Sequence, residues 1–116
     1  PRRASARFPR GRAAAVDRAA IMIDMSEIAK LYEIEESAGQ GAKDQVLKDI
    51  QRDNRPLYQK IQAGLYVLLQ ADPARAGNAV LAYEKDAPSQ GGIVLVGFTP
   101  QRMTAQEFQA APKAGQ

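Results

Sequence analysis

Apolar and polar residues alternate with a helical period in the stretch from residue 17 to residue 36. Four apolar residues there recur at intervals of four, three and four positions, which is the spacing of one face of an α-helix. These residues are Ile21, Met25, Ile28 and Tyr32. The pattern predicts an amphipathic helix over residues 17–36 that packs this face against a core.

Polar residues and glycines indicate where this helix begins and ends. Asp24 and Glu27 lie three residues apart, which is the spacing of a helix-capping pair, and they indicate an alternative start at Met25. Acidic residues gather at positions 33, 35 and 36, although the C-terminal end of a helix favours cations. We therefore expect the helix to end near Ser37, with the glycines at 39 and 41 closing it.

Two shorter helices are predicted in the stretch that follows. The first covers residues 43–53 and carries Val46, Leu47 and Ile50 on its inner face. The second follows the sequence DNRP, in which an Asp or Asn caps the helix and a proline occupies its first turn. It is expected to end before Gly64.

After Gly64 the pattern changes to short apolar runs, which are typical of β-strands. The runs are LYVLL (65–69), NAVLAYE (78–84) and IVLVGF (93–98). The third run has no polar residue, which predicts a central place in a sheet. Within it, Gly97 indicates a bulge or a close backbone approach, and Pro100 is expected to break the pairing that follows.

A last short helix is predicted in the sequence MTAQEFQAA. Thr104 and Glu107 have the register of a capping box, and Met103 is placed to contact Phe108 across the first turn. Residues 112–116 show no such pattern and are expected to form a loose C-terminus.

This order of elements predicts one α+β domain over residues 17–111. An N-terminal amphipathic helix and short helices would pack on a small three-stranded antiparallel sheet, and a short C-terminal helix would complete the domain. A chain of 116 residues has room for one such core.

Charge separates the two ends of the chain. The net charge is +3, but residues 1–16 carry five Arg and no acid, whereas the rest carries eleven basic residues against thirteen acidic ones. The five are Arg2, Arg3, Arg7, Arg10 and Arg12. We expect residues 1–16 to be a mobile basic tail, with three interpretations: a solvated tail or upstream remnant, an arm that binds nucleic acid or an acidic partner, or a targeting peptide.

Composition excludes much of catalytic chemistry. The sequence has no Cys and no His, so disulfides, thiolate metal sites and the usual catalytic triads are excluded. The one grouping for acid–base work is Glu84, Lys85 and Asp86, which we expect to be solvated loop residues. The Gly-rich stretch SAGQGAKD lacks the spacing of a phosphate-binding loop. No catalytic, cofactor or metal site is predicted.

The stretch NAVLAYEKDAPSQGGIVLVGF, followed by RMTAQEFQAA, resembles the C-terminal part of pseudopilin-like extracytoplasmic proteins of the planctomycete type. The resemblance covers roughly residues 64–111, and the sequence GFTP stands where that family has an Asp-Gly turn. It implies a long N-terminal helix laid on a small antiparallel sheet. It also implies an envelope or assembly role without known catalysis, and it carries no functional residues to transfer.

These observations favour a non-enzymatic structural or interaction domain that is a subunit or accessory protein of a larger envelope or membrane-associated assembly. We expect other protein subunits as partners, bound through the five tail arginines and through Ile21, Met25, Ile28 and Tyr32. The alternative is a binder of nucleic acid or an acidic partner through the tail. An extracytoplasmic location is favoured, and any membrane association is expected to need a segment that this sequence does not contain, because no run approaches the ~20 apolar residues that span a bilayer.

Overall fold

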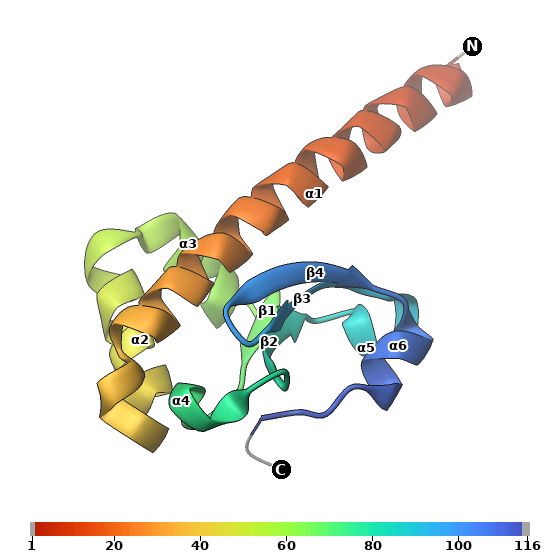
Figure 1. The fold of residues 1–116 in the computed structure, drawn as a ribbon. Coiled ribbons are helices and arrows are strands. Elements are labelled where there is room, and N and C mark those ends of the chain that lie inside the picture. The colour runs from red at the N-terminus through yellow and green to blue at the C-terminus, as the bar shows by residue number, and fades with distance from the viewer. Residues whose placement is uncertain (1, 115–116) are drawn as a thin grey trace.

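The computed structural model describes residues 2–114 of the chain, and it describes side chains from residue 18 onward. Within residues 2–114, six α-helices and one 3-10 helix accompany a four-stranded antiparallel sheet (Figure 1). The elements in chain order are α1 (Arg2–Ile34), η1 (Glu36–Gly41), α2 (Ala42–Asp53), α3 (Arg55–Gln62), β1 (Tyr66–Leu68), α4 (Pro73–Ala76), β2 (Val80–Glu84), α5 (Ala87–Gln90), β3 (Gly92–Val96), β4 (Thr99–Met103) and α6 (Ala105–Ala110). The predicted α+β class is confirmed, but the sheet has four strands and not three.

Helix α1 passes through Asp24 without interruption, so the alternative start at Met25 is wrong. The Asp24 carboxylate is not available as a cap, because it accepts hydrogen bonds from the Tyr66 hydroxyl at 2.6 Å and from Lys60 Nζ at 2.9 Å. The helix ends at Ile34, three residues before the expected Ser37, and continues as the 3-10 helix η1. The predicted mobile tail overlaps the first part of α1, where side chains lie outside the described residues, so its mobility stays a prediction.

The buried face of α1 is the one that the helical spacing predicts. Met25, Ile28 and Tyr32 are fully buried, Ala29 is nearly so, and Ile21 packs half-buried at the edge of the same cluster. This cluster also contains residues of α2, α3 and the facing side of the sheet. The helix therefore forms the main cover of that side of the sheet, and Figure 1 shows α1 crossing the sheet and running on past it toward the N-terminus.

The two short helices after α1 are confirmed. Helix α2 buries Val46 and Ile50 and half-buries Leu47. Asn54 caps α3, because its side-chain oxygen accepts a hydrogen bond from the Leu57 N–H at 3.3 Å, and a proline lies in the first turn. Helix α2 has no side-chain cap and follows from its apolar face, whereas α3 also follows from its cap and its proline.

The strands follow one another in the order β1-β2-β3-β4, so β3 is central as predicted. All three pairings are antiparallel. The register between β2 and β3 shifts between Val80 and Ala82. As a result Leu81 and Ala82 both join the core under α1, whereas Val80 joins the cluster on the opposite side.

Strand β4 corrects the expectation that Pro100 breaks pairing. Pro100 is paired with Leu95, in the middle of a continuous register from Gly92–Met103 to Val96–Thr99. The Ile93 N–H points toward β2, where it is bonded to the Glu84 side chain, so the Ile93–Arg102 pair is not hydrogen-bonded between β3 and β4. Hydrogen-bonded and non-hydrogen-bonded pairs alternate along antiparallel strands, so the Leu95–Pro100 pair is not hydrogen-bonded either. Pro100 therefore lies where no backbone donor is needed, on an edge strand.

The β3–β4 connection explains Gly97. Gly97 and Phe98 form a two-residue turn between the paired Val96 and Thr99, with a φ of 59° at Gly97. A Cβ at this position would lie 2.7 Å from the backbone oxygen of Gly77. The predicted close backbone approach is thus confirmed, although the glycine lies in the turn and not inside the strand.

The side of the sheet away from α1 has its own small core. Helix α6 begins with the predicted capping box: Thr104 Oγ1 accepts from the Glu107 N–H at 3.0 Å, and Glu107 Oε1 accepts from the Thr104 N–H at 2.8 Å. Phe108 packs against Tyr83 with ring centroids 4.8 Å apart. Met103 packs against the cluster that contains Phe108, and the direct contact between Met103 and Phe108 stays a prediction.

The chain after α6 is anchored as far as Ala114, although a loose end was expected there. The Val80 N–H donates to the Pro112 oxygen at 2.8 Å, and the Ala114 N–H donates to the Val80 oxygen at 2.8 Å. Lys113 Nζ lies 4.4 Å from the centre of the Phe108 ring. These contacts extend the sheet beside β2 in a region that β1 does not reach.

Tyr32 provides a pH-dependent test of the core. Its hydroxyl donates to the Leu69 oxygen at 2.9 Å, and burial raises the pKa of Tyr32 far above its usual value of 10.0. In the unfolded chain the phenol ionises near pH 10, while the folded chain keeps the proton, so the free energy of unfolding falls as pH rises above about 10.

We expect Tyr32→Phe to lower the free energy of unfolding by about 0.5–1.5 kcal/mol at neutral pH, through loss of the hydrogen bond. The deficit should shrink or reverse above about pH 10, because the variant has no phenol at this position to ionise. Urea unfolding followed by circular dichroism at several pH values measures this. A deficit that stays constant up to pH 11 would contradict the buried neutral phenol, and Tyr58→Phe on the half-buried face of α3 is the control.

Candidate functional site

One row of side chains crosses the sheet at the end from which α1 departs toward the N-terminus. Tyr66 of β1 is paired with Glu84 of β2, and Ile93 of β3 is paired with Arg102 of β4. Glu84 and Ile93 are joined by a hydrogen bond from the Ile93 N–H to the Glu84 carboxylate. Tyr66 and Ile93 belong to the core cluster under α1, so this row faces the helix and forms the polar margin of that core.

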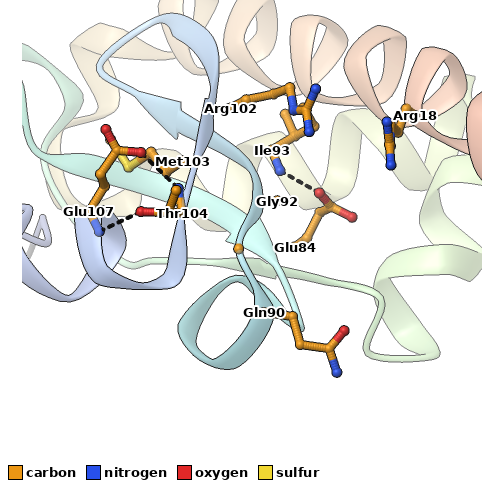
Figure 2. Close-up of a pocket in the computed structure, with 10 residues that line it drawn as sticks. Arg18, Glu84, Gln90, Gly92, Ile93, Arg102, Met103, Thr104 and Glu107 are labelled. Carbon is orange, nitrogen blue, oxygen red and sulfur yellow. Dashed lines mark hydrogen bonds between the residues drawn. The ribbon is translucent and has the colours of Figure 1, made fainter.

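A pocket of about 600 Å³ opens beside this row (Figure 2). Its walls come from α1, the end of β2, the α5–β3 junction, the end of β4 and the start of α6. The residues that line it are Arg18, Glu84, Gln90, Gly91, Gly92, Ile93, Arg102, Met103, Thr104 and Glu107. Elements distant in sequence thus bring two guanidinium groups and two carboxylates to one surface depression.

Both carboxylates of the pocket are bonded to backbone N–H groups. Glu84 accepts from Ile93, and Glu107 accepts from Thr104 within the capping box. The position of Glu84 also depends on Gly92, because a Cβ at Gly92 would collide with the Glu84 carboxylate. These acids therefore hold the strand and helix ends in place, and neither is paired with an arginine among the described residues.

The two arginines of the pocket have no such partners. Within the described side chains from residue 18 to 114, neither Arg18 nor Arg102 forms a hydrogen bond or an ion pair, and both are exposed. Figure 2 shows Arg18 on α1 and Arg102 on β4, with Glu84 between them in that view. The pocket thus has unused cationic donors.

A smaller pocket of about 290 Å³ lies on the other side of Glu84. It is lined by Ala20, Ile21, Lys60, Leu65, Tyr66, Glu84, Lys85 and Asp86. Next to it, Asp24 is bonded to both Tyr66 and Lys60, which ties α1 to β1 and α3. These bonds fasten the helix to the body next to Met25, which is fully buried in the core.

The grouping considered for acid–base work, Glu84, Lys85 and Asp86, lines this smaller pocket. Glu84 is held by the Ile93 N–H, while Lys85 and Asp86 are exposed at the turn before α5. No ion pair joins them in the described part of the chain. In the same part, no group of three or more acidic side chains is arranged to hold a metal ion.

A second charged cluster lies where α1 meets α2. A hydrogen bond shared with Asp49 raises the pKa of Glu35, and Arg52 lowers the pKa of Asp53. Arg52 contacts Asp49 at 3.2 Å and Asp53 at 2.9 Å. Because Glu35, Arg52 and Asp53 are at the surface, this cluster is a solvated ion-pair network of small energetic weight.

The structure separates the residues that the sequence suggested for partner binding. Met25, Ile28 and Tyr32 lie inside the core of this chain, and Ile21 lies at its edge beside the smaller pocket. The side chains of Arg2, Arg3, Arg7, Arg10 and Arg12 lie outside the described residues. The sequence interpretation missed Arg18 and Arg102. Strand alternation continued through Pro100 would have placed Arg102 on the side of the sheet that faces α1.

Comparison of the chain with protein-family models, with curated proteins and with solved structures finds no match. The pseudopilin-like resemblance therefore stays a hypothesis. Among the described residues, no helix combines the length and apolar content needed to cross a bilayer.

Proposed function

We propose that this chain is a non-enzymatic interaction domain that works as a subunit or accessory protein of a larger assembly. The observation that carries the proposal is the extent of α1. The helix has 33 residues, but its fully buried side chains in the described part lie between Met25 and Tyr32. The helix continues past the sheet (Figure 1), so its N-terminal part extends beyond the strands against which Met25, Ile28 and Tyr32 pack.

The charged groups of the body support an architectural role. Glu84, Glu107 and Asp24 are each committed to a hydrogen bond that holds elements together. Catalysis by a carboxylate needs a group whose lone pairs face a substrate and whose pKa suits proton transfer. Glu84, Glu107 and Asp24 lie in or beside the two surface pockets, and each accepts a hydrogen bond that holds parts of the fold together.

The resemblance described above supports an envelope or membrane-associated setting. A long N-terminal helix laid on a small antiparallel sheet is the arrangement it implies, and α1 crosses the four-stranded sheet in that way. An extracytoplasmic location is proposed on this basis. Other protein subunits are its proposed partners.

We expect the chain to self-associate in the micromolar range, as measured by sedimentation velocity over a concentration series. Ile23, with 69% of its surface exposed on α1, is the probe position. A charge there, as in Ile23→Glu, should shift the association to higher concentration, because a charged group would have to be buried at a helix interface. Gln45→Glu, at an exposed position of α2, adds the same charge as a control. A strictly monomeric chain throughout the range would count against the proposal.

The Arg-rich sequence of residues 1–16 favours a second candidate function, binding of nucleic acid or an acidic partner. Such binding would weaken steeply with salt, because each neutralised phosphate releases counterions. Titration with single-stranded DNA, with and without residues 1–16, tests this alternative.

A further inference from the structure

The two exposed arginines of the larger pocket come from opposite sides of the helix–sheet junction. Arg18 lies on α1 just before the apolar face begins, and Arg102 lies near the end of the edge strand β4. Neither has a hydrogen-bonding or ion-pair partner among the described residues 18–114. Figure 2 shows that both side chains border the same pocket.

These arginines are suited to binding a carboxylate. A guanidinium group presents a planar set of donors that matches the two oxygens of a carboxylate, and such charge-assisted pairs are among the stronger hydrogen bonds. The two acids of the pocket are bonded to backbone N–H groups, and among the described residues neither forms an ion pair with Arg18 or Arg102. The two guanidinium groups are therefore available to an anion from outside the chain.

We propose that Arg18 and Arg102 bind an acidic side chain or the terminal carboxylate of a partner protein segment. The proposal rests on the interaction-domain function proposed above and names the chemistry of the partner. The bound segment lies in the pocket between α1 and the end of β4. It places its carboxylate against the two guanidinium groups.

The edge strand favours a peptide as the occupant. Arg102 is at a position of β4 whose backbone N–H and oxygen point away from β3, because its pair with Ile93 is not hydrogen-bonded. An extended peptide can use such groups as an additional strand does. Pro100, two residues earlier, has no N–H and limits the added pairing to the end of β4, beside the pocket.

The surrounding charge disfavours a polyphosphate. Glu84 lies in the same pocket, and residues 17–116 carry eleven basic against thirteen acidic residues. A nucleic acid brings closely spaced phosphates that these acids would repel, whereas one carboxylate needs only the two arginines. The five arginines that precede Arg18 in the sequence add long-range attraction for an acidic protein.

Fluorescence anisotropy tests the proposal at low salt with a fluorescein-labelled glycine hexapeptide that contains one glutamate and has an amidated C-terminus. Arg18→Gln and Arg102→Gln should each weaken binding about tenfold or more, because each removes a charge-assisted pair. Arg55→Gln removes an exposed arginine of α3 outside the pocket and should change the affinity by less than about twofold. The same peptide with glutamine in place of the glutamate is the matched control and should not bind. Circular dichroism confirms that each variant is folded.

Three results would overturn the proposal. One is equal binding by the native chain and the two pocket variants. Another is binding that disappears only when residues 1–16 are deleted, which would assign the peptide to the tail. The third is tighter binding of single-stranded DNA than of the peptide, with an equal loss of DNA affinity in both pocket variants. Self-association in the sedimentation experiment is measured separately, so failure of peptide binding with assembly intact would reject this site alone.

Discussion

Replacing Ile28 by alanine should lower the free energy of unfolding by about 2–5 kcal/mol, the range for removing a large aliphatic side chain from a packed core. Ile28 has 0% of its surface exposed and belongs to the cluster between α1 and the sheet. The change removes buried apolar area and leaves a cavity that rigid neighbours on the sheet fill poorly. Urea unfolding followed by circular dichroism measures the loss.

Ile23→Ala is the matched control because the same two residue types are exchanged in the same helix. Ile23 is 69% exposed, and alanine is the better helix former, so the change should stay within about 0.5 kcal/mol. Equal losses at the two positions would show that α1 does not bury the face described here. A loss at Ile23 that grows with protein concentration would instead report an interface between chains.

Replacing Gly91 by alanine should lower the free energy of unfolding by about 2–4 kcal/mol, because the new side chain meets strain and a clash together. Gly91 has a φ of 78° and a ψ of 170°, a conformation that side chains rarely adopt. A Cβ there would lie 2.7 Å from the Met103 oxygen and 3.1 Å from the Thr104 Cα, both backbone atoms. Relief would require β3 to move away from the start of α6, which would also change the shape of the pocket.

Gly41→Ala provides the comparison for Gly91→Ala in thermal and urea unfolding. Gly41 has a φ of −83°, and no atom lies within 4 Å of a Cβ built there. Alanine reduces the entropy of the unfolded chain, which stabilises the fold. Alanine is also a poorer N-cap residue than glycine, which destabilises the helix, so the two effects oppose each other. We expect a net change within about 0.5 kcal/mol. A Gly91 variant as stable as the Gly41 variant would contradict the close contact between β3 and α6.

Helix positions and caps could be read from the sequence because they depend on near neighbours. The Thr104–Glu107 box and the Asn54 cap each use a side chain within three residues of the N–H it satisfies. The apolar face from Met25 to Tyr32 follows from the helical period alone. Local signals failed for Asp24, whose carboxylate bonds to Tyr66, 42 residues away in the sequence.

The fourth strand and the candidate site could not be read in the same way. Pro100 is compatible with β4 only because its missing N–H faces away from β3, and that direction depends on the register of β4 against β3. Arg18 and Arg102 are 84 positions apart and meet at one pocket because α1 crosses the end of the sheet. Neither arginine stands out in its own sequence neighbourhood.

The sequence by itself determined the α+β class, the buried face of the first helix, the helix caps and the exclusion of thiol and imidazole chemistry. These follow from residue types and from spacings of a few positions. Only the tertiary structure decided the number of strands, the acids that hold strand and helix ends, and the two arginines that have no partner among the described residues. Those features depend on which distant segments the shared core brings together, because strand register and pocket walls are set by contacts between elements and not within them.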